Sequence, residues 1–241
     1  MSPGVPASSP TGWKAPSCHE HHAPEVDEGL AVKPILLEWA ATLVSYFLLG
    51  LIRILTGSQA RWWGCPPKAL QRIYFANHQS HADLVMIWAA LPKELRRSTR
   101  AVAARDYWGK TPFRHWLTSA VFNVIYVSRS RHADEDPLEP LVDALQAGDS
   151  LILFPEGTRG FADEPQAFKA GLYNLALKFP EVELVPAWIN NVQRVMPKGE
   201  VVPVPVLCSV TFGLPMQVLA GEDCHTFLQR ARSAVIALRY V

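Results

Sequence analysis

The amino-acid sequence predicts an α/β fold, with a mostly parallel central sheet flanked by helices and an N-terminal apolar helix that associates with a membrane. Three observations lead to this prediction. Beyond residue 70, strand-like apolar runs alternate with helix-like runs, an order typical of parallel sheets with helices on both faces. Residues 34–57 are strongly apolar. The length of 241 residues suits one such domain with short appendages.

The first segment, residues 1–33, is rich in Pro, Ser and Ala and has no hydrophobic periodicity, so we expect it to be disordered. It has neither a basic start nor an apolar core before Leu30, which argues against a signal peptide. A Cys-His tract at residues 18–22 contains metal-ligating residue types. Because a flexible tail orders ligands poorly, we favour a tail without a metal.

Residues 34–57 are expected to form an apolar helix that associates with a membrane. Between Glu38 and Arg53 lie fourteen uncharged residues, fewer than the roughly 18 to 20 of a confident span. The segment therefore crosses the bilayer with Glu38 near one interface, lies flat on its surface, or is an ordinary core helix. Basic residues follow it and acidic ones precede it, which for a spanning helix predicts that the domain beyond faces the cytoplasm.

Residues 58–241 are expected to form the α/β domain. Its predicted strands are residues 72–76, 101–104, 124–128, 150–154, 184–189 and 207–212. Its predicted helices are residues 84–91, 112–122, 138–147, 166–178 and 224–238. Pro137 and Gly148 bracket the third of these helices, in the asymmetry typical of helix starts and ends.

Composition excludes several classes of protein. A net charge of +1, without a basic stripe, argues against a nucleic-acid-binding protein. The 4 cysteines are scattered without a CxxC pair, which indicates reduced thiols and neither a disulfide framework nor a zinc site. The 8 tryptophans suit a membrane interface, although burial in an ordinary core explains them equally well.

The heptad NHQSHAD, at residues 77–83, stands between a predicted strand and a predicted helix. On a continuous helix, His78 and Asp83 would lie roughly 140° apart. If the helix begins inside the heptad, the two side chains can meet and form a general base, with the carboxylate fixing the imidazole tautomer. Ser80 either bonds within this loop or is a hydrolase nucleophile, but no GxSxG elbow surrounds it. The other alternative is that His78, His81 and Asp83 bind a metal ion.

A second motif, FPEGTR at residues 154–159, also follows a predicted strand. In open α/β sheets, ligands bind beyond the carboxyl ends of the strands. Gly157 lets the backbone approach a ligand closely, and Arg159 offers a planar fork for a phosphate or carboxylate. Glu156 is suited to anchoring a backbone amide or a substrate hydroxyl.

Together, and in this order and spacing, the two motifs resemble the glycerolipid acyltransferase family, which acylates glycerol 3-phosphate and lysophosphatidic acid. Weaker similarities lie at residues 127–129, 168–171 and 185–187, so that the resemblance runs from about Gln71 to Pro215. One departure is Gly160, where many members carry Ser.

The resemblance implies an acyl transfer from acyl-CoA or acyl carrier protein to a lysophospholipid hydroxyl, without a cofactor or metal. His78 is the implied base and Asp83 its orienting group. The implied substrate-binding residues are Glu156, Gly157, Thr158, Arg159, Arg129 and Arg105. Arg105 binds the acceptor phosphate or pairs with its neighbour Asp106.

The expected activity is therefore acylation of 1-acylglycerol 3-phosphate to phosphatidate in phospholipid biosynthesis, at a membrane. Alternatives are acylation of another lysolipid, such as a lyso-ornithine lipid, and a lipid-binding or remodelling protein with little catalysis.

Overall fold

The computed structural model describes residues 39–47, 50, 59–80, 82–104, 116, 118–120, 122–127, 136–160, 162, 164–190 and 208–241. The predicted disordered tail at residues 1–33 lies outside them. Within the predicted apolar helix at residues 34–57, residues 39–47 and 50 are helical, and the others lie outside the described residues. Among the described helices, none has the length and apolar character needed to cross a bilayer.

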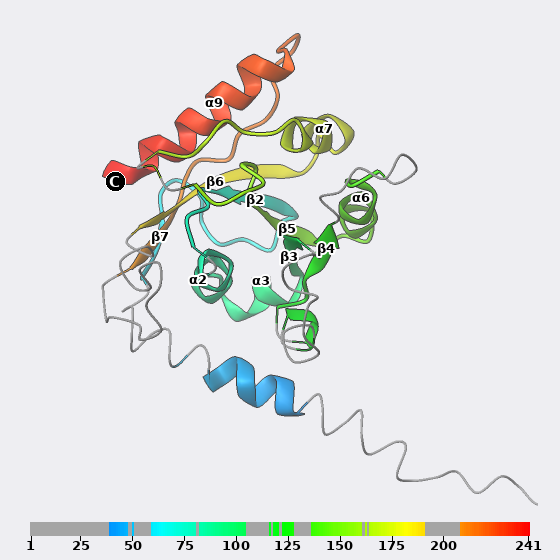
Figure 1. Cartoon of the computed structure of the whole chain (residues 1–241), viewed down its shortest axis with the longest axis vertical. Coiled ribbons are helices and arrows are strands. Elements are labelled where there is room, and N and C mark those ends of the chain that lie inside the picture. The colour runs from blue at the N-terminus through cyan, green and yellow to red at the C-terminus, as the bar shows by residue number, and fades with distance from the viewer. Residues whose placement is uncertain are drawn as a thin grey trace, which may run out of the picture.

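The strands of the described chain form one mixed sheet in the order β1-β7-β6-β2-β5-β3-β4 (Figure 1). They are β1 (Gln59–Trp62), β2 (Arg72–Ala76), β3 (Thr99–Ala104), β4 (Ile125–Val127), β5 (Ser150–Leu153), β6 (Glu183–Asn190) and β7 (Ser209–Phe212). Neighbouring strands pair in parallel, except β6 and β7, which are antiparallel. The predicted α/β fold with a mostly parallel sheet is confirmed.

Helices cover both faces of this sheet (Figure 1). Helices α2 (Asp83–Ala90) and α3 (Lys93–Arg97) lie on one face. Helices α6 (Glu139–Gln146), α7 (Gly171–Lys178) and α9 (Cys224–Ala237) lie on the other, and a short 3₁₀ helix, η1 (Leu238–Tyr240), follows α9.

Strand β2 lies inside the sheet and separates two hydrophobic clusters. All five of its residues are buried. Because successive side chains point to opposite faces, Tyr74 packs in the cluster with α2, whereas Ile73 and Phe75 pack in the cluster with α6, α7 and α9. A shift of β2 by one residue would move each of these side chains into the opposite cluster, where it does not fit, so the loop that follows β2 starts from a fixed position.

Three elements differ from the prediction. Helix α7 begins at Gly171 and not at residue 166, because the preceding residues use their amides for bonds to a neighbouring loop. Strand β1 and helix α3 were not predicted. Strand β1 is a short, largely exposed edge strand, and α3 is a charged five-residue helix with one buried side chain. Of the helix predicted at 112–122, residues 116 and 118–120 are helical, and most of the others lie outside the described residues.

Candidate active site

The sheet register brings the two sequence motifs side by side. Strands β2 and β5 are parallel neighbours, with Phe75 opposite Leu153. NHQSHAD continues β2 and FPEGTR continues β5, so both loops leave the same edge of the sheet. His78 and Glu156 each come three residues after the paired positions. Such an edge, beyond the carboxyl ends of parallel strands, is where open α/β sheets bind ligands.

His78 and Asp83 are in contact. The His78 Nδ1 lies 2.9 Å from the Asp83 Oδ2, because α2 begins at Asp83 and His78 stays on the loop, as the sequence predicted. The same Oδ2 accepts the backbone amides of Gln79 at 2.6 Å and Ser80 at 2.7 Å. Asp83 is only 1% exposed, so its carboxylate is held in position by three hydrogen bonds and by burial.

The imidazole of His78 is also held across its face. Its ring stacks on Phe154, the first residue of FPEGTR, with centroids 4.4 Å apart and planes 21° from parallel. With Nδ1 bonded to Asp83, the nitrogen that remains to take a proton is Nε2. The side chain is 17% exposed, so a substrate has limited but real access to it. This arrangement is suited to general-base chemistry.

Glu156 joins the two loops through backbone amides. Its Oε1 accepts the amide of His78 at 2.7 Å, and its Oε2 accepts the amide of Gln166 at 2.8 Å. The amide of Gly160 donates to the carbonyl oxygen of His78 at 2.8 Å, so both backbone groups of His78 are bonded to the FPEGTR loop. Glu156 is 2% exposed, and this burial raises the pKa of its carboxyl against the opposing effect of the two amides.

The first residue of NHQSHAD has a structural role that sequence reasoning missed. Asn77 is buried, and its side chain forms two hydrogen bonds with the backbone of one residue of β6. Its Nδ2 donates to the carbonyl oxygen of Ile189 at 3.1 Å, and its Oδ1 accepts the amide of Ile189 at 2.8 Å. These hydrogen bonds tie the NHQSHAD loop to β6, the strand beside β2. Nothing local in the sequence signals them, because the two residues are far apart along the chain.

The other predicted residues of this region fall into two groups. Thr158 and Arg159 are exposed on the loop, and Gly157 adopts a left-handed φ of 70°. The amide of Gly157 donates to the carbonyl oxygen of Phe154 at 3.0 Å, which closes the turn. Arg105, Arg129 and His81 lie outside the described residues, so their roles stay predictions.

Ser80 and Gly160 behave as parts of the loop scaffold. The hydroxyl oxygen of Ser80 accepts the amide of Ala82 at 3.2 Å, which agrees with a role within the loop. A Cβ at Gly160 would lie 3.1 Å from Oε2 of Glu156 and 3.3 Å from Nε2 of Gln166. The glycine thus accommodates the carboxylate that holds His78, and a serine there would require these neighbours to move.

Metal ligands do not gather in the part of the chain that the structure describes: no group of three His, Cys, Asp or Glu side chains is placed to hold an ion.

Several known proteins are similar in sequence to this chain. The 1-acyl-sn-glycerol-3-phosphate acyltransferase of Chlamydomonas reinhardtii is 27% identical over 173 residues, which cover 70% of this chain and 50% of that protein. The 1-acyl-sn-glycerol-3-phosphate acyltransferase of Cocos nucifera is 31% identical over 132 residues, which cover 52% of this chain and 42% of that protein. The alpha form from Homo sapiens is 26% identical over 178 residues, which cover 71% of this chain and 60% of that protein. The chain thus spans about half the length of the curated relatives it matches.

The fold is that of a solved structure. It resembles the crystal structure of the 1-acyl-sn-glycerophosphate acyltransferase PlsC from Thermotoga maritima, with a TM-score of 0.59 and 21% identity, over 90% of this chain and 83% of that one. The sequence model of the acyltransferase family matches residues 67–190, which contain both motifs and the strands that carry them. The chain therefore belongs to the acyltransferase family.

Proposed function

We propose that this protein transfers a fatty acyl group from acyl-CoA or acyl carrier protein to the free hydroxyl of 1-acylglycerol 3-phosphate, forming phosphatidate. The observation that carries the proposal is the imidazole of His78, bonded to Asp83 through Nδ1 and stacked on Phe154. The relatives' shared activity supports the choice of acceptor.

In this mechanism Nε2 of His78 takes the proton of the acceptor hydroxyl as the hydroxyl oxygen bonds to the thioester carbonyl carbon. The carbon–sulfur bond then breaks, and the proton passes from the imidazolium to the leaving thiolate. Asp83 stabilises the imidazolium that forms between these steps. Because a thioester is already activated, no covalent enzyme intermediate is needed.

The oxyanion of the tetrahedral intermediate requires a donor, and backbone amides at Glu156 and Gly157 remain our proposal for it. The amide of Gly157 presently donates to Phe154, so it would have to be shared or released during the reaction. Arg159, exposed at the end of the motif, is proposed to bind the acceptor phosphate.

The test is an assay of coenzyme A release by the purified protein, with a panel of acceptors that share an acyl chain and differ in headgroup. We expect 1-acylglycerol 3-phosphate to give the highest kcat/KM. Preference for another lysolipid would keep the acyltransferase and reject this acceptor. No transfer to any acceptor would favour a lipid-binding or remodelling protein.

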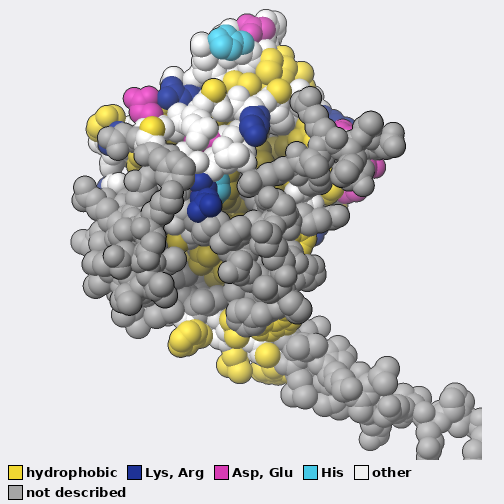
Figure 2. Space-filling view, viewed as in Figure 1, with side chains coloured by type: hydrophobic (Ala, Val, Ile, Leu, Met, Phe, Trp, Pro, Cys, Tyr) yellow, Lys and Arg dark blue, Asp and Glu magenta, His cyan; other side chains and the backbone are white. Residues whose placement is uncertain are grey.

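We also propose that the protein works on a membrane surface, where its acceptor resides. The helix at residues 39–47 has no charged residue; Ala41 is buried, and Val44 packs against the hydrophobic cluster that contains α2. Its opposite side carries Trp39, Leu43 and Phe47, spaced four residues apart and each about two-thirds exposed. Figure 2 shows hydrophobic side chains gathered at the lower end of the molecule, where Figure 1 places this helix. A helix that is apolar on its exposed side suits the interface of a bilayer.

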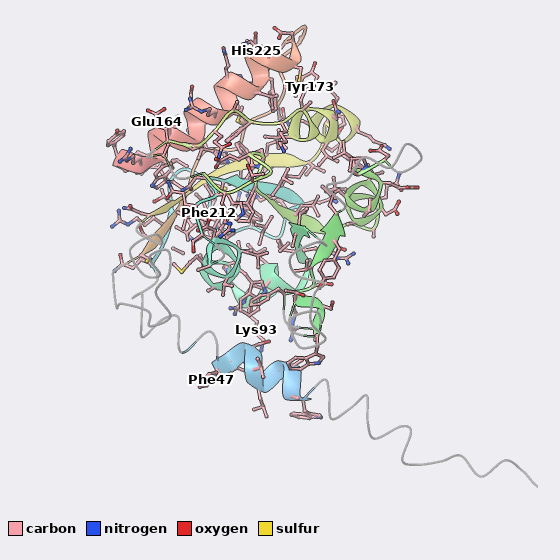
Figure 3. The ribbon with its side chains drawn as sticks, in the orientation of Figure 1. Phe47, Lys93, Glu164, Tyr173, Phe212 and His225 are labelled. Carbon is pink, nitrogen blue, oxygen red and sulfur yellow. The ribbon has the colours of Figure 1, made fainter. Side chains whose placement is uncertain are left out.

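Basic residues of α3 lie next to this helix. Lys93 projects from α3 toward the helix that carries Phe47 (Figure 3), with its Nζ 5.9 Å from the ring centroid of Tyr46. A hydrogen bond with Lys93 lowers the pKa of Tyr46, and the charges of Arg97 and Arg96 act in the same direction. The positive charge of Lys93 beside the apolar stripe supports contact with anionic headgroups.

Replacing Trp39, Leu43 and Phe47 together by serine is expected to lower the vesicle-bound fraction several-fold, because the apolar area that enters the bilayer is lost. The measurement is co-sedimentation with vesicles of phosphatidylcholine, with and without phosphatidylglycerol. Leu177→Ser and Leu219→Ser, at exposed positions elsewhere in the domain, are the matched controls. Equal binding by the triple variant and the wild type would refute this assignment.

A further inference from the structure

A lysine outside both motifs lies along the FPEGTR loop. The stretch at residues 165–169 runs beside this loop, held by the bond from the Gln166 amide to Glu156 and by a bond of 2.9 Å from the Lys169 amide to the carbonyl oxygen of Pro155. Phe168, just before Lys169, is buried and packs edge-on against Phe75 of β2. The backbone of Lys169 is therefore fixed relative to the candidate active site.

The side chain of Lys169 crosses Gly157. If Gly157 carried a Cβ, the Nζ, Cε and Cδ of Lys169 would lie 2.5, 2.8 and 3.0 Å from it. The left-handed φ of 70° favours glycine at position 157, and any side chain there would displace the end of the Lys169 side chain. The ammonium of Lys169 consequently lies against the middle of FPEGTR, one residue from the carboxylate that holds the His78 amide.

The charges around this point are unbalanced. Lys169 is exposed, and no carboxylate of the described residues lies within 4.0 Å of its ammonium. Arg159, at the end of the same loop, is also exposed and has no acidic partner among the described side chains. By contrast, the more distant Arg232 and Arg230 are paired with Glu164 and Glu222. Two cations without such partners beside a catalytic base form a site suited to an anion.

We propose that Lys169, together with Arg159, binds a phosphate group of one of the substrates, and that Gly157 lacks a side chain so that the lysine can reach over the loop. This inference rests on the proposed function for its substrates. The phosphate has two possible sources, the phosphate monoester of the lysolipid acceptor and the phosphates of coenzyme A. The same chemistry serves both, so the experiment is designed to separate them.

The experiment compares Lys169→Gln, Lys169→Arg and Lys178→Gln with the wild type. Lys178, exposed at the end of α7, is the matched control. Loss of one charge-assisted hydrogen bond is expected to raise the KM of a single substrate about tenfold with little change in kcat. Lys169→Arg, which keeps the charge, should restore most of this loss. The Lys178→Gln variant should behave as the wild type.

Truncated substrates identify the source of the phosphate. If the acceptor phosphate is bound, Lys169→Gln should affect acylation of 1-acylglycerol 3-phosphate and not of a monoacylglycerol. If coenzyme A is bound, the variant should affect reactions of acyl-CoA and not of an acyl-pantetheine, which lacks the nucleotide phosphates. Unchanged KM values for both full substrates, in a variant with wild-type thermal stability, would overturn the proposal.

Calorimetric binding of glycerol 3-phosphate and of coenzyme A needs no turnover, so it separates this inference from the proposed function. Binding of one of them that weakens about tenfold in Lys169→Gln supports the site even if no acceptor is acylated. Acyl transfer by the wild type, together with identical binding by wild type and variant, rejects the site and leaves the proposed function standing.

Discussion

Replacing Asp83 by Asn is expected to lower kcat by about a thousandfold and to leave the KM of the acceptor nearly unchanged. The three bonds to Asp83 end on the same oxygen, Oδ2, and two of them come from the backbone amides of Gln79 and Ser80. Since only an oxygen can accept those amides, the asparagine carbonyl should take its place and keep His78 oriented. What the variant loses is the negative charge that stabilises the imidazolium.

The measurement is steady-state kinetics with each substrate varied in turn. Asp143→Asn, at an exposed position of α6, controls for the general effect of removing one carboxylate. Asp83→Ala should lose all three bonds, so its melting temperature should fall below that of Asp83→Asn. A correctly folded Asp83→Asn variant with wild-type kcat would contradict the role given to this carboxylate.

Glu156→Gln is expected to lower kcat about a hundredfold, the size of effect that follows a displacement of a catalytic group by about 1 Å. Each carboxylate oxygen of Glu156 accepts one backbone amide, from His78 and from Gln166. A glutamine has one accepting oxygen, so one of these amides would face an NH₂ group. Whichever amide loses its acceptor, the hydrogen bonds that join the two loops weaken, and the loop that carries His78 shifts.

Glu164→Gln is the matched control, because Glu164 follows the FPEGTR loop in the sequence but is largely exposed and paired with Arg232. It should retain wild-type kcat. If Glu156→Gln and Glu164→Gln both retain it, the amide bonds of Glu156 do not position His78 for catalysis.

Burial also makes the stability conferred by Glu156 depend on pH. Because burial raises the pKa of this carboxyl, the folded chain holds its proton more tightly than the unfolded chain does. The resulting stability is complete below the unfolded-state pKa and is lost as pH rises through the folded-state pKa. The glutamine side chain in the Glu156→Gln variant does not titrate. The free energy of unfolding of the wild type, relative to that variant, should therefore decrease with rising pH across this window.

The sequence predicted the elements that have strong local patterns. Strand β2 was predicted with its observed bounds, and β5 and β6 within one residue at each end, because each is a buried apolar run with a clear boundary. Helix α2 was predicted at residues 84–91 and begins one residue earlier, at Asp83, which meets the condition stated for contact between His78 and Asp83. Helix α3 escaped prediction because its five residues, four of them charged, give too little hydrophobic periodicity to reveal a helix.

The contacts that hold the site together could not be predicted, because they join distant parts of the chain. Asn77 bonds to Ile189 of β6, and Glu156 bonds to His78 and Gln166. Such bonds depend on the order of strands in the sheet, which a periodic pattern does not specify. The same bonds explain why residues 166–170 are not helical, although their composition allowed it.

The most direct test of the account is the rate of coenzyme A release by His78→Ala, Asp83→Asn and the double variant in one assay with acyl-CoA and a lysolipid acceptor. If the two residues act as one base, His78→Ala should lose most of the rate enhancement, and adding Asp83→Asn should lower the rate no further. Activity of His78→Ala at the wild-type rate would contradict the mechanism.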